Sequence, residues 1–176
     1  MRVITSFDDR SPVPWANGAG ETTELVSMTD SETFTPHLRG WRLSIAALEK
    51  PGPFSSLPGL ARSFLPTAEV VLEIDGRVHR ADPHQVLRFH GEQEVALLGL
   101  SRPCHAVNLM VADADGGAGC GEAAETIRMS ADRETAVARH RFAVTLNVVP
   151  GCSRFQLLEL DLGEVLPTGL DAVILH

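Results

Sequence analysis

The chain has 176 residues, of which 44% are hydrophobic and 22% charged, enough apolar material for one domain or two small fused units. Its 15 Lys and Arg residues against 23 Asp and Glu residues give a net charge of −8, which argues against nucleic acid as a partner. No window is apolar for long enough to span a bilayer, and the start MRVITSFDDR lacks a signal-peptide pattern. We therefore expect a cytoplasmic protein without a membrane partner.

The sequence of the first two thirds of the chain predicts mainly short strands. Segments in which apolar and polar residues alternate are separated there by Gly, Pro, Asn and Asp. We predict strands over residues 2–6, 21–27, 40–48, 61–66, 68–74, 77–80, 85–89, 94–100 and 106–112. Segments 7–14, 28–39 and 50–59 are predicted loops, and Asp75-Gly76 is a predicted hairpin turn. The clearest alternation, over 40–48, puts Trp41, Leu43 and Ile45 on one face and Arg42, Ser44 and Ala46 on the other.

The last third continues the pattern after a Gly-, Ala- and Asp-rich loop over 113–121, which we take as the boundary between a first half at 1–112 and a second at 122–176. Strands are predicted over 126–129, 135–138, 142–149, 155–160 and 172–175, with a short helical turn over 130–139 as an alternative. Since no long amphipathic helix is evident, the expected fold class is an all-β sandwich or barrel of antiparallel strands.

The stretch PWANGAGETTEL, residues 14–25, has the strongest functional pattern. Asn17-Gly18 favours a tight turn, because both residues tolerate a positive φ. Gly20 lets the backbone approach a neighbour that a side chain would block. Thr22 and Glu24 then follow on the predicted strand. The alternative interpretation is an ordinary turn in which Trp15 packs as an anchor.

Further blocks follow this stretch in order: GWRLSIA at 40–46, GPFSSLPGLAR at 52–62, FHGE at 89–92 and NLM at 108–110. Together with Trp-x-Asn-Gly-x-Gly-x-Thr-x-Glu, they resemble the HutD/Ves family over residues 1–110. The resemblance implies a cupin-type fold, a double-cupin (bicupin) β-barrel. It also implies a ligand-binding or regulatory role, in a family some of whose members accompany histidine-utilisation genes.

A metal centre is not expected. A metal-binding cupin needs a His-x-His pair, a Glu and a later His that converge on one ion, whereas His79, His84 and His90 are spaced by five and six residues. We expect these histidines to lie at the surface or in turns, and we expect no metal and no other cofactor.

Cysteine chemistry and nucleotide binding are also disfavoured. Cys104, Cys120 and Cys152 are odd in number and have no Cys-x-x-Cys spacing, so neither a disulfide framework nor a zinc site is indicated. Cys120 lies in a loop by composition and is the candidate for an exposed thiol. No Gly-x-Ser-x-Gly elbow is present, and the Gly pair is followed by Glu21 rather than the Lys of a phosphate-binding loop.

The remaining polar groups form the candidate ligand site: Trp15, Asn17, Thr22, Glu24, Arg42, Ser44, Arg62, Asn108 and Met110. Arg binds carboxylates bidentately, and an arginine inside a barrel needs a charged partner or a ligand. Arg62, which follows a loop rich in Pro and Gly, is the predicted carboxylate ligand. Arg42 is predicted to be mainly structural, in a buried salt bridge to Glu24 or Glu73.

One position departs from the family pattern. Members tend to carry an Asp two residues before the late Asn, where this chain has Ala106, and the neighbouring His105 points to the opposite face of a regular strand. We expect a protein that binds a small anionic metabolite and forms a homodimer. The alternatives are a metal-independent enzyme acting on a small carboxylic acid, for which no catalytic residue is identified, and a structural or interaction protein without a ligand.

Overall fold

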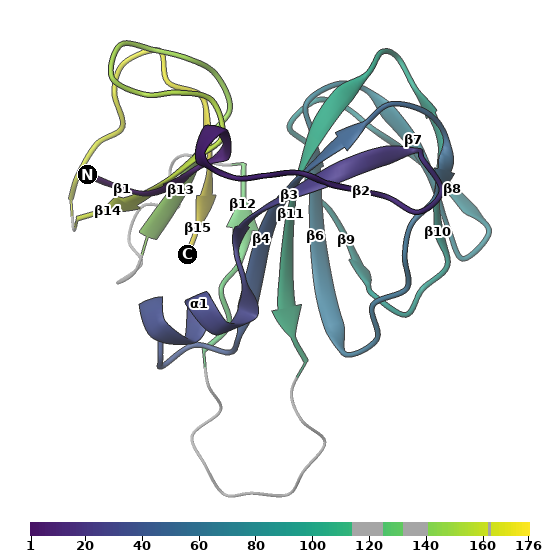
Figure 1. Cartoon of the computed structure of the whole chain (residues 1–176), viewed down its shortest axis with the longest axis horizontal. Helices are drawn as coiled ribbons and strands as arrows, with labels where there is room; N and C mark the ends of the chain where they lie inside the picture. The colour runs from purple at the N-terminus through teal and green to yellow at the C-terminus, as the bar shows by residue number, and fades with distance from the viewer. Residues whose placement is uncertain (114–124, 132–140, 162) are drawn as a thin grey trace, which may run out of the picture.

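The fold of the chain is all-β, as the computed structural model describes it for residues 1–113, 125–131, 141–161 and 163–176. The strands of these residues form three sheets in which every strand pairing is antiparallel. A six-stranded sheet lies in the middle, between a four-stranded and a five-stranded sheet (Figure 1). None of the three sheets closes on itself within the described residues, so the expected closed barrel is not found.

The two faces of the central sheet differ: one packs against the five-stranded sheet and the other carries polar side chains. Its strands, in spatial order, are β2 (Val13–Pro14), β3 (Gly20–Val26), β4 (Trp41–Leu48), β11 (Cys104–Ala112), β6 (Leu60–Pro66) and β9 (Leu87–His90). One face presents the buried side chains of Trp41, Leu43 and Leu109 to the five-stranded sheet. The other face carries Arg42 and Ser44. The alternation predicted for β4 is therefore confirmed.

The four-stranded sheet covers part of that second face. It consists of β5 (Gly52–Pro53), β10 (Val95–Leu100), β7 (Val70–Ile74) and β8 (Arg77–Ala81). Leu72 and Leu97 pack with Phe64 of the central sheet in one buried cluster. The turn between β7 and β8 has φ values of 47° at Asp75 and 74° at Gly76, the left-handed conformation that two-residue hairpin turns require. The predicted hairpin is therefore confirmed.

The five-stranded sheet combines the two ends of the chain. It consists of β1 (Arg2–Ser6), β14 (Gln156–Leu160), β13 (Arg141–Thr145), β15 (Ala172–Leu175) and β12 (Met129–Ser130). Phe142, Val144 and Leu157 share one buried cluster with Trp41 of the central sheet, and the ring centres of Phe142 and Trp41 are 5.8 Å apart. The strands of the other two sheets all end by residue 112. Those of the five-stranded sheet all lie after residue 112, except for β1, which pairs with β14.

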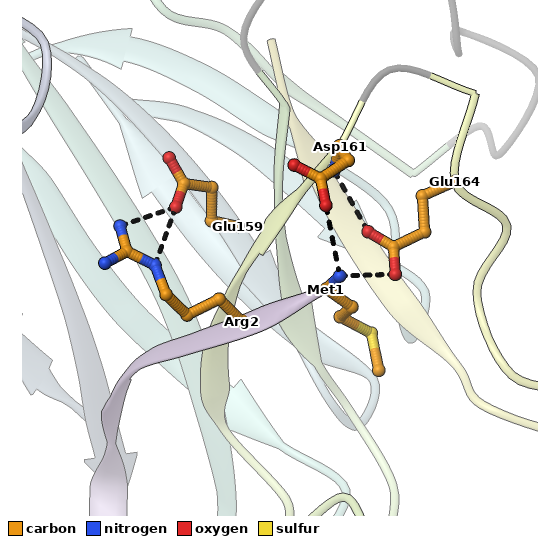
Figure 2. A network of polar contacts seen from close by, with 5 residues as sticks. All are labelled: Met1, Arg2, Glu159, Asp161 and Glu164. Atoms are coloured by element: carbon orange, nitrogen blue, oxygen red, sulfur yellow. Dashed lines mark hydrogen bonds and ion pairs between the residues drawn. The ribbon is translucent and has the colours of Figure 1, made fainter.

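Charged side chains mark the place where β1 joins the far end of the chain (Figure 2). Nε and Nη2 of Arg2 donate to Oε2 of Glu159 at 2.9 and 2.6 Å. The amino group of Met1 donates to Glu164, and its nitrogen lies 3.6 Å from Asp161 Oδ2. The hydrogen bond from Met1 lowers the pKa of the Glu164 carboxyl. Because these pairs are solvent-exposed, the backbone ladder between β1 and β14 is the main attachment.

A helix, α1 (Met28–Phe34), lies in the segment that we had predicted as loop, so that prediction was wrong. Ser27 Oγ accepts from the backbone N–H of Asp30, and the Ser27 N–H donates to Asp30 Oδ2, both at 3.1 Å, which forms a capping box. These hydrogen bonds lower the pKa of Asp30. The residue after the helix, Thr35, accepts from Trp41 Nε1 at 2.8 Å and so orients the largest buried side chain.

The other differences concern segment boundaries. The predicted loops at 7–14 and 50–59 contain the 3-10 turn η1 (Phe7–Asp9) and the two-residue strands β2 and β5. The strand predicted over 142–149 ends at Thr145, and the strand predicted over 126–129 begins at Met129. The predictions for 135–138, for a helical turn over 130–139 and for Cys120 lie outside the described residues. No helix in the described part of the chain is long and apolar enough to cross a membrane.

Candidate functional site

A cavity of about 890 Å³ opens on the second face of the central sheet. Its walls come from β3, β4, β6 and β11, from the segment 10–17 and from the segment 53–57. All nine predicted site residues line it: Trp15, Asn17, Thr22, Glu24, Arg42, Ser44, Arg62, Asn108 and Met110. The volume lies in the range of small-molecule pockets.

The residues of the opening motif build one wall, and their polar groups are already used within the fold. Trp15 Nε1 donates to Thr22 Oγ1 at 2.7 Å. Asn17 Oδ1 accepts from the backbone N–H of Ala19 at 2.9 Å, and Asn17 Nδ2 donates to the Pro53 carbonyl at 3.2 Å. The motif therefore holds the turn against β5, and Trp15 lines the cavity.

Gly20 allows this wall to form. A Cβ atom added there would lie 2.1 Å from the carbonyl oxygen of Ala47 on β4, closer than side-chain atoms approach. The register of β3 and β4, with Gly20 opposite Leu48, therefore depends on a glycine at this position. Gly18 has a φ of 62°, as the predicted Asn-Gly turn requires.

Glu24 and Arg42 form the predicted ion pair, on the side of the cavity nearer β3. The exposed fractions of their side chains are 43% and 29%, so the pair is partly solvated rather than buried as we had expected. Nη1 of Arg42 also lies 3.9 Å from the sulfur of Met110. Partly exposed pairs contribute little to stability, so the structural role of Arg42 is smaller than predicted.

Arg62 lies within β6, in agreement with the strand predicted over 61–66, and follows the loop rich in Pro and Gly. It is opposite Phe89 on one side and Met110 on the other. Its exposed fraction is 8%. Burial, and to a smaller extent the cation of Arg42, lowers the pKa of Arg62 to about 10.

The contacts of Arg62 are weak ones. Its guanidinium carbon lies 5.0 Å from the ring centre of Phe89 and 5.6 Å from that of Phe54, within cation–π range. Nη1 and Nη2 lie 3.5 Å from the Ser55 carbonyl and from Asn108 Oδ1, the outer limit for hydrogen bonds. Nε has no hydrogen-bond partner, and no carboxylate pairs with Arg62 within the described residues. The fold thus buries a cation without an anion.

Two further polar groups lie beside this cation. Asn108 is directly opposite Ser44 across the β11–β4 pairing, and both residues are buried. Ser44 Oγ has no partner within the described residues, and Asn108 Nδ2 has only the Ala106 carbonyl at 3.5 Å. We call Arg62, Ser44 and Asn108 the floor of the cavity. The floor presents several hydrogen-bond donors that lack acceptors.

Ala106 explains part of this imbalance. It is completely buried and lies opposite Ala46, two residues before Asn108 on the same face of β11. A carboxylate in its place would stand beside the floor, whereas alanine leaves the cation unmatched. His105 points to the other face, as predicted, and packs on Phe7 and Phe155. Burial lowers the pKa of His105, and the nearby Arg154 lowers it further.

The sequence did not single out the apolar part of the lining. Ala46, Leu48, Phe54, Leu57 and Phe64 contribute to it, and Trp15, Phe54 and Phe64 form a chain of ring contacts. Continuing the alternation from Arg42 and Ser44 would have found Ala46 and Leu48, and continuing it from Arg62 would have found Phe64. Arg10, which also lines the cavity, carried no such signal.

The described residues contain no group of three or more His, Cys, Asp or Glu side chains that could hold a metal ion. His79 and His84 are exposed, as predicted, and His90 lies 3.9 Å from Asp113. Cys104 and Cys152 are buried free thiols, and burial raises the pKa of Cys104.

Comparisons with known sequences place these features in a family. The HutD family model matches residues 8–161. Protein Ves of Cronobacter sakazakii is 38% identical over 84 residues, which are 46% of this chain and 44% of Ves. A Pseudomonas putida protein described as an uncharacterized 21.2 kDa protein in the hutC 3' region is 35% identical over 107 residues, 59% of this chain and 55% of that protein. The chain thus matches about half the length of these curated relatives.

Solved structures have the same fold over nearly the whole chain. HutD from Pseudomonas fluorescens SBW25 has a TM-score of 0.62 and 23% identity, over 97% of this chain and 91% of that one. The conserved protein of unknown function PA5104 from Pseudomonas aeruginosa PAO1 has a TM-score of 0.63 and 21% identity, over 99% and 90%. Because the family model covers most of its length, the chain belongs to the HutD family.

Proposed function

We propose that this protein binds a small anionic metabolite whose carboxylate contacts Arg62 on the floor of the cavity. The observation that carries the proposal is the burial of Arg62, 8% exposed, without an acidic partner within the described residues. A buried charge without a counter-ion is costly, and a bound carboxylate would offset that cost.

The floor suits a carboxylate in particular. Nε of Arg62 has no acceptor, and a guanidinium donates two parallel hydrogen bonds to a planar carboxylate. Ser44 Oγ, which is also unpartnered, can donate to one of the ligand's oxygens, and Asn108 Nδ2 is available nearby. The apolar lining is available to the rest of the ligand.

Binding is favoured over catalysis by the titratable groups around the cavity. Among the described lining residues Glu24 is the one carboxylate, and none is a His or a Cys. Glu24 already pairs with Arg42, which leaves it a poor general base. No observation at this cavity supports the alternative of an enzyme acting on a small acid.

Calorimetric titration with small monocarboxylic acids, including urocanate, tests the proposal. Arg62→Ala should weaken binding by about 1.5–3 kcal/mol, the range for a hydrogen bond to a charged group. Arg2→Ala is the matched control, because it removes an exposed guanidinium from the five-stranded sheet. Titrations in which no acid binds, or in which the Arg62→Ala protein binds as tightly as the wild type, would refute the proposal and favour a structural or interaction role.

Three finer expectations belong to the same proposal. The name of the Pseudomonas putida relative supports a role in histidine or other amino-acid utilisation. The division of the strands near residue 112 supports a double-cupin arrangement with halves at 1–112 and 122–176. A cytoplasmic location and a homodimer are consistent with a binding or regulatory protein of this kind.

A further inference from the structure

We infer that the cavity selects monocarboxylates over dianions, and that Glu24 sets this selectivity by holding Arg42 away from the floor. The inference rests on the proposed function and adds to it the charge of the ligand and the residue that decides that charge. It follows from the order of four side chains across the central sheet: Glu24, Arg42, Met110 and Arg62.

These side chains form a row on one face of the sheet. Met110 of β11 is opposite Arg42 of β4 and opposite Arg62 of β6. The two arginines therefore flank one residue, and their backbones lie roughly 10 Å apart, twice the spacing between strands. The cation of Arg42 contributes to lowering the pKa of Arg62, so the two guanidiniums are close enough to affect one another.

Glu24 stands at the β3 end of the row. It pairs in register with Ser44, the residue two positions after Arg42, and its Oε2 accepts from Nε of Arg42. This ion pair holds Arg42 toward β3, on the side away from Arg62, and matches its charge. The remaining contact of Arg42 is a distant one, 3.9 Å from the sulfur of Met110.

Charges around the cavity then favour a ligand with a single negative charge. Arg62 is the one cation of the lining that is both buried and without a carboxylate partner in the described residues. Arg10 also lines the cavity, but it is exposed, so water screens its charge. A dianion would bring a second buried charge with no cation beside it, whereas a monocarboxylate is matched by Arg62 alone.

Removing the acidic side chain should change this preference. In Glu24→Gln the guanidinium of Arg42 loses its carboxylate and becomes free to approach the anion that Arg62 holds. The lining would then offer two unmatched arginines, an arrangement suited to a dianion. Specificity of this kind is a difference between two affinities, so it is measured as a ratio.

Two probes with the same planar apolar body measure that ratio. Benzoate carries one charge, and phenylphosphonate carries two when titrated at alkaline pH. We expect wild-type protein to bind benzoate at least about tenfold more tightly than phenylphosphonate, a difference of about 1.4 kcal/mol. Glu24→Gln should lower this ratio by at least about tenfold, and the double variant Glu24→Gln with Arg42→Gln should restore it. Glu21→Gln, on the same strand but outside the cavity lining, is the control for the change in net charge.

The outcomes separate this inference from the proposed function. Binding that depends on Arg62 but shows no preference for benzoate, or a ratio that Glu24→Gln leaves unchanged, would refute the inference alone. Failure of the double variant to restore the ratio would do the same, because it would exclude Arg42 as the source of the effect. If neither probe binds in a way that depends on Arg62, both the inference and the proposed function are wrong.

Discussion

Replacing Arg62 with methionine should make the ligand-free protein more stable while weakening its affinity for carboxylates. Methionine has a similar length and no charge, so it can fill the space among Phe54 and Phe89 without the desolvation cost. Lowering the pKa of an arginine from its usual value to about 10 corresponds to about 3 kcal/mol, at about 1.36 kcal/mol for each pKa unit. A cation whose pKa is lowered by folding destabilises the fold at every pH below about 10, so the cost applies fully at neutral pH.

Lost contacts reduce this gain. Two cation–π contacts disappear with the guanidinium, each worth about 0.5–1 kcal/mol, and the two contacts at 3.5 Å add little. We therefore expect Arg62→Met to raise the free energy of unfolding by about 1–2 kcal/mol. For a domain of this size that corresponds to a rise of about 2–8 °C in Tm.

Urea denaturation of dialysed, ligand-free protein is the assay, with thermal melting beside it. A higher midpoint with an unchanged m value indicates a change in stability rather than in compactness. Arg42→Met is the control, because its partly exposed ion pair with Glu24 should contribute at most about 1 kcal/mol and its loss should destabilise slightly. An Arg62→Met protein that is less stable than the wild type by about 1 kcal/mol or more would show that Arg62 serves the fold, and the reasoning from its unmatched charge would be wrong.

Three further predictions concern the wall, the histidines and assembly. Gly20→Ala should destabilise the protein by about 1–3 kcal/mol, because its Cβ would meet the Ala47 carbonyl, whereas Gly99→Ala, with no atom within 4 Å of the added Cβ, should not; equal melting temperatures for the two variants would contradict this. Elemental analysis should find no stoichiometric zinc, iron or manganese, and about one metal ion per chain that is lost on replacing His79 would overturn that prediction. Light scattering should give a dimer, since the edge strand β8 leaves Val78 64% exposed; a monomer at high concentration would exclude it.

Local signals predicted the strands well and the helix badly. The alternation of β4 and the turn at Asp75-Gly76 involve neighbours in sequence, so residue pattern alone was sufficient. The helix α1 has seven residues, too few for a periodic apolar face to be recognised. Its capping box was readable at Ser27 and Asp30, but it has Asp where the usual pattern has Glu or Gln.

Strand partners were beyond the reach of the sequence. β1 pairs with β14, 150 or more residues later in the chain, and its sequence resembles that of any other short strand. Which strands pair depends on how apolar faces pack against one another, and this is a property of the whole chain.

For the site, the sequence determined which side chains meet. Ordered motif blocks and strand alternation identified nine residues that all line one cavity. Only the tertiary structure decided which of their polar groups remain without a hydrogen-bond or ion-pair partner. Asn17 donates a hydrogen bond to Pro53 of β5, 36 residues away, and Arg42 of β4 pairs with Glu24 of the neighbouring strand β3. Arg62 is left buried and unmatched because its neighbours, Asn108 on β11 and Ser55 after β5, supply no carboxylate. Burial and pairing of a charge depend on the surrounding atoms rather than on adjacent residues.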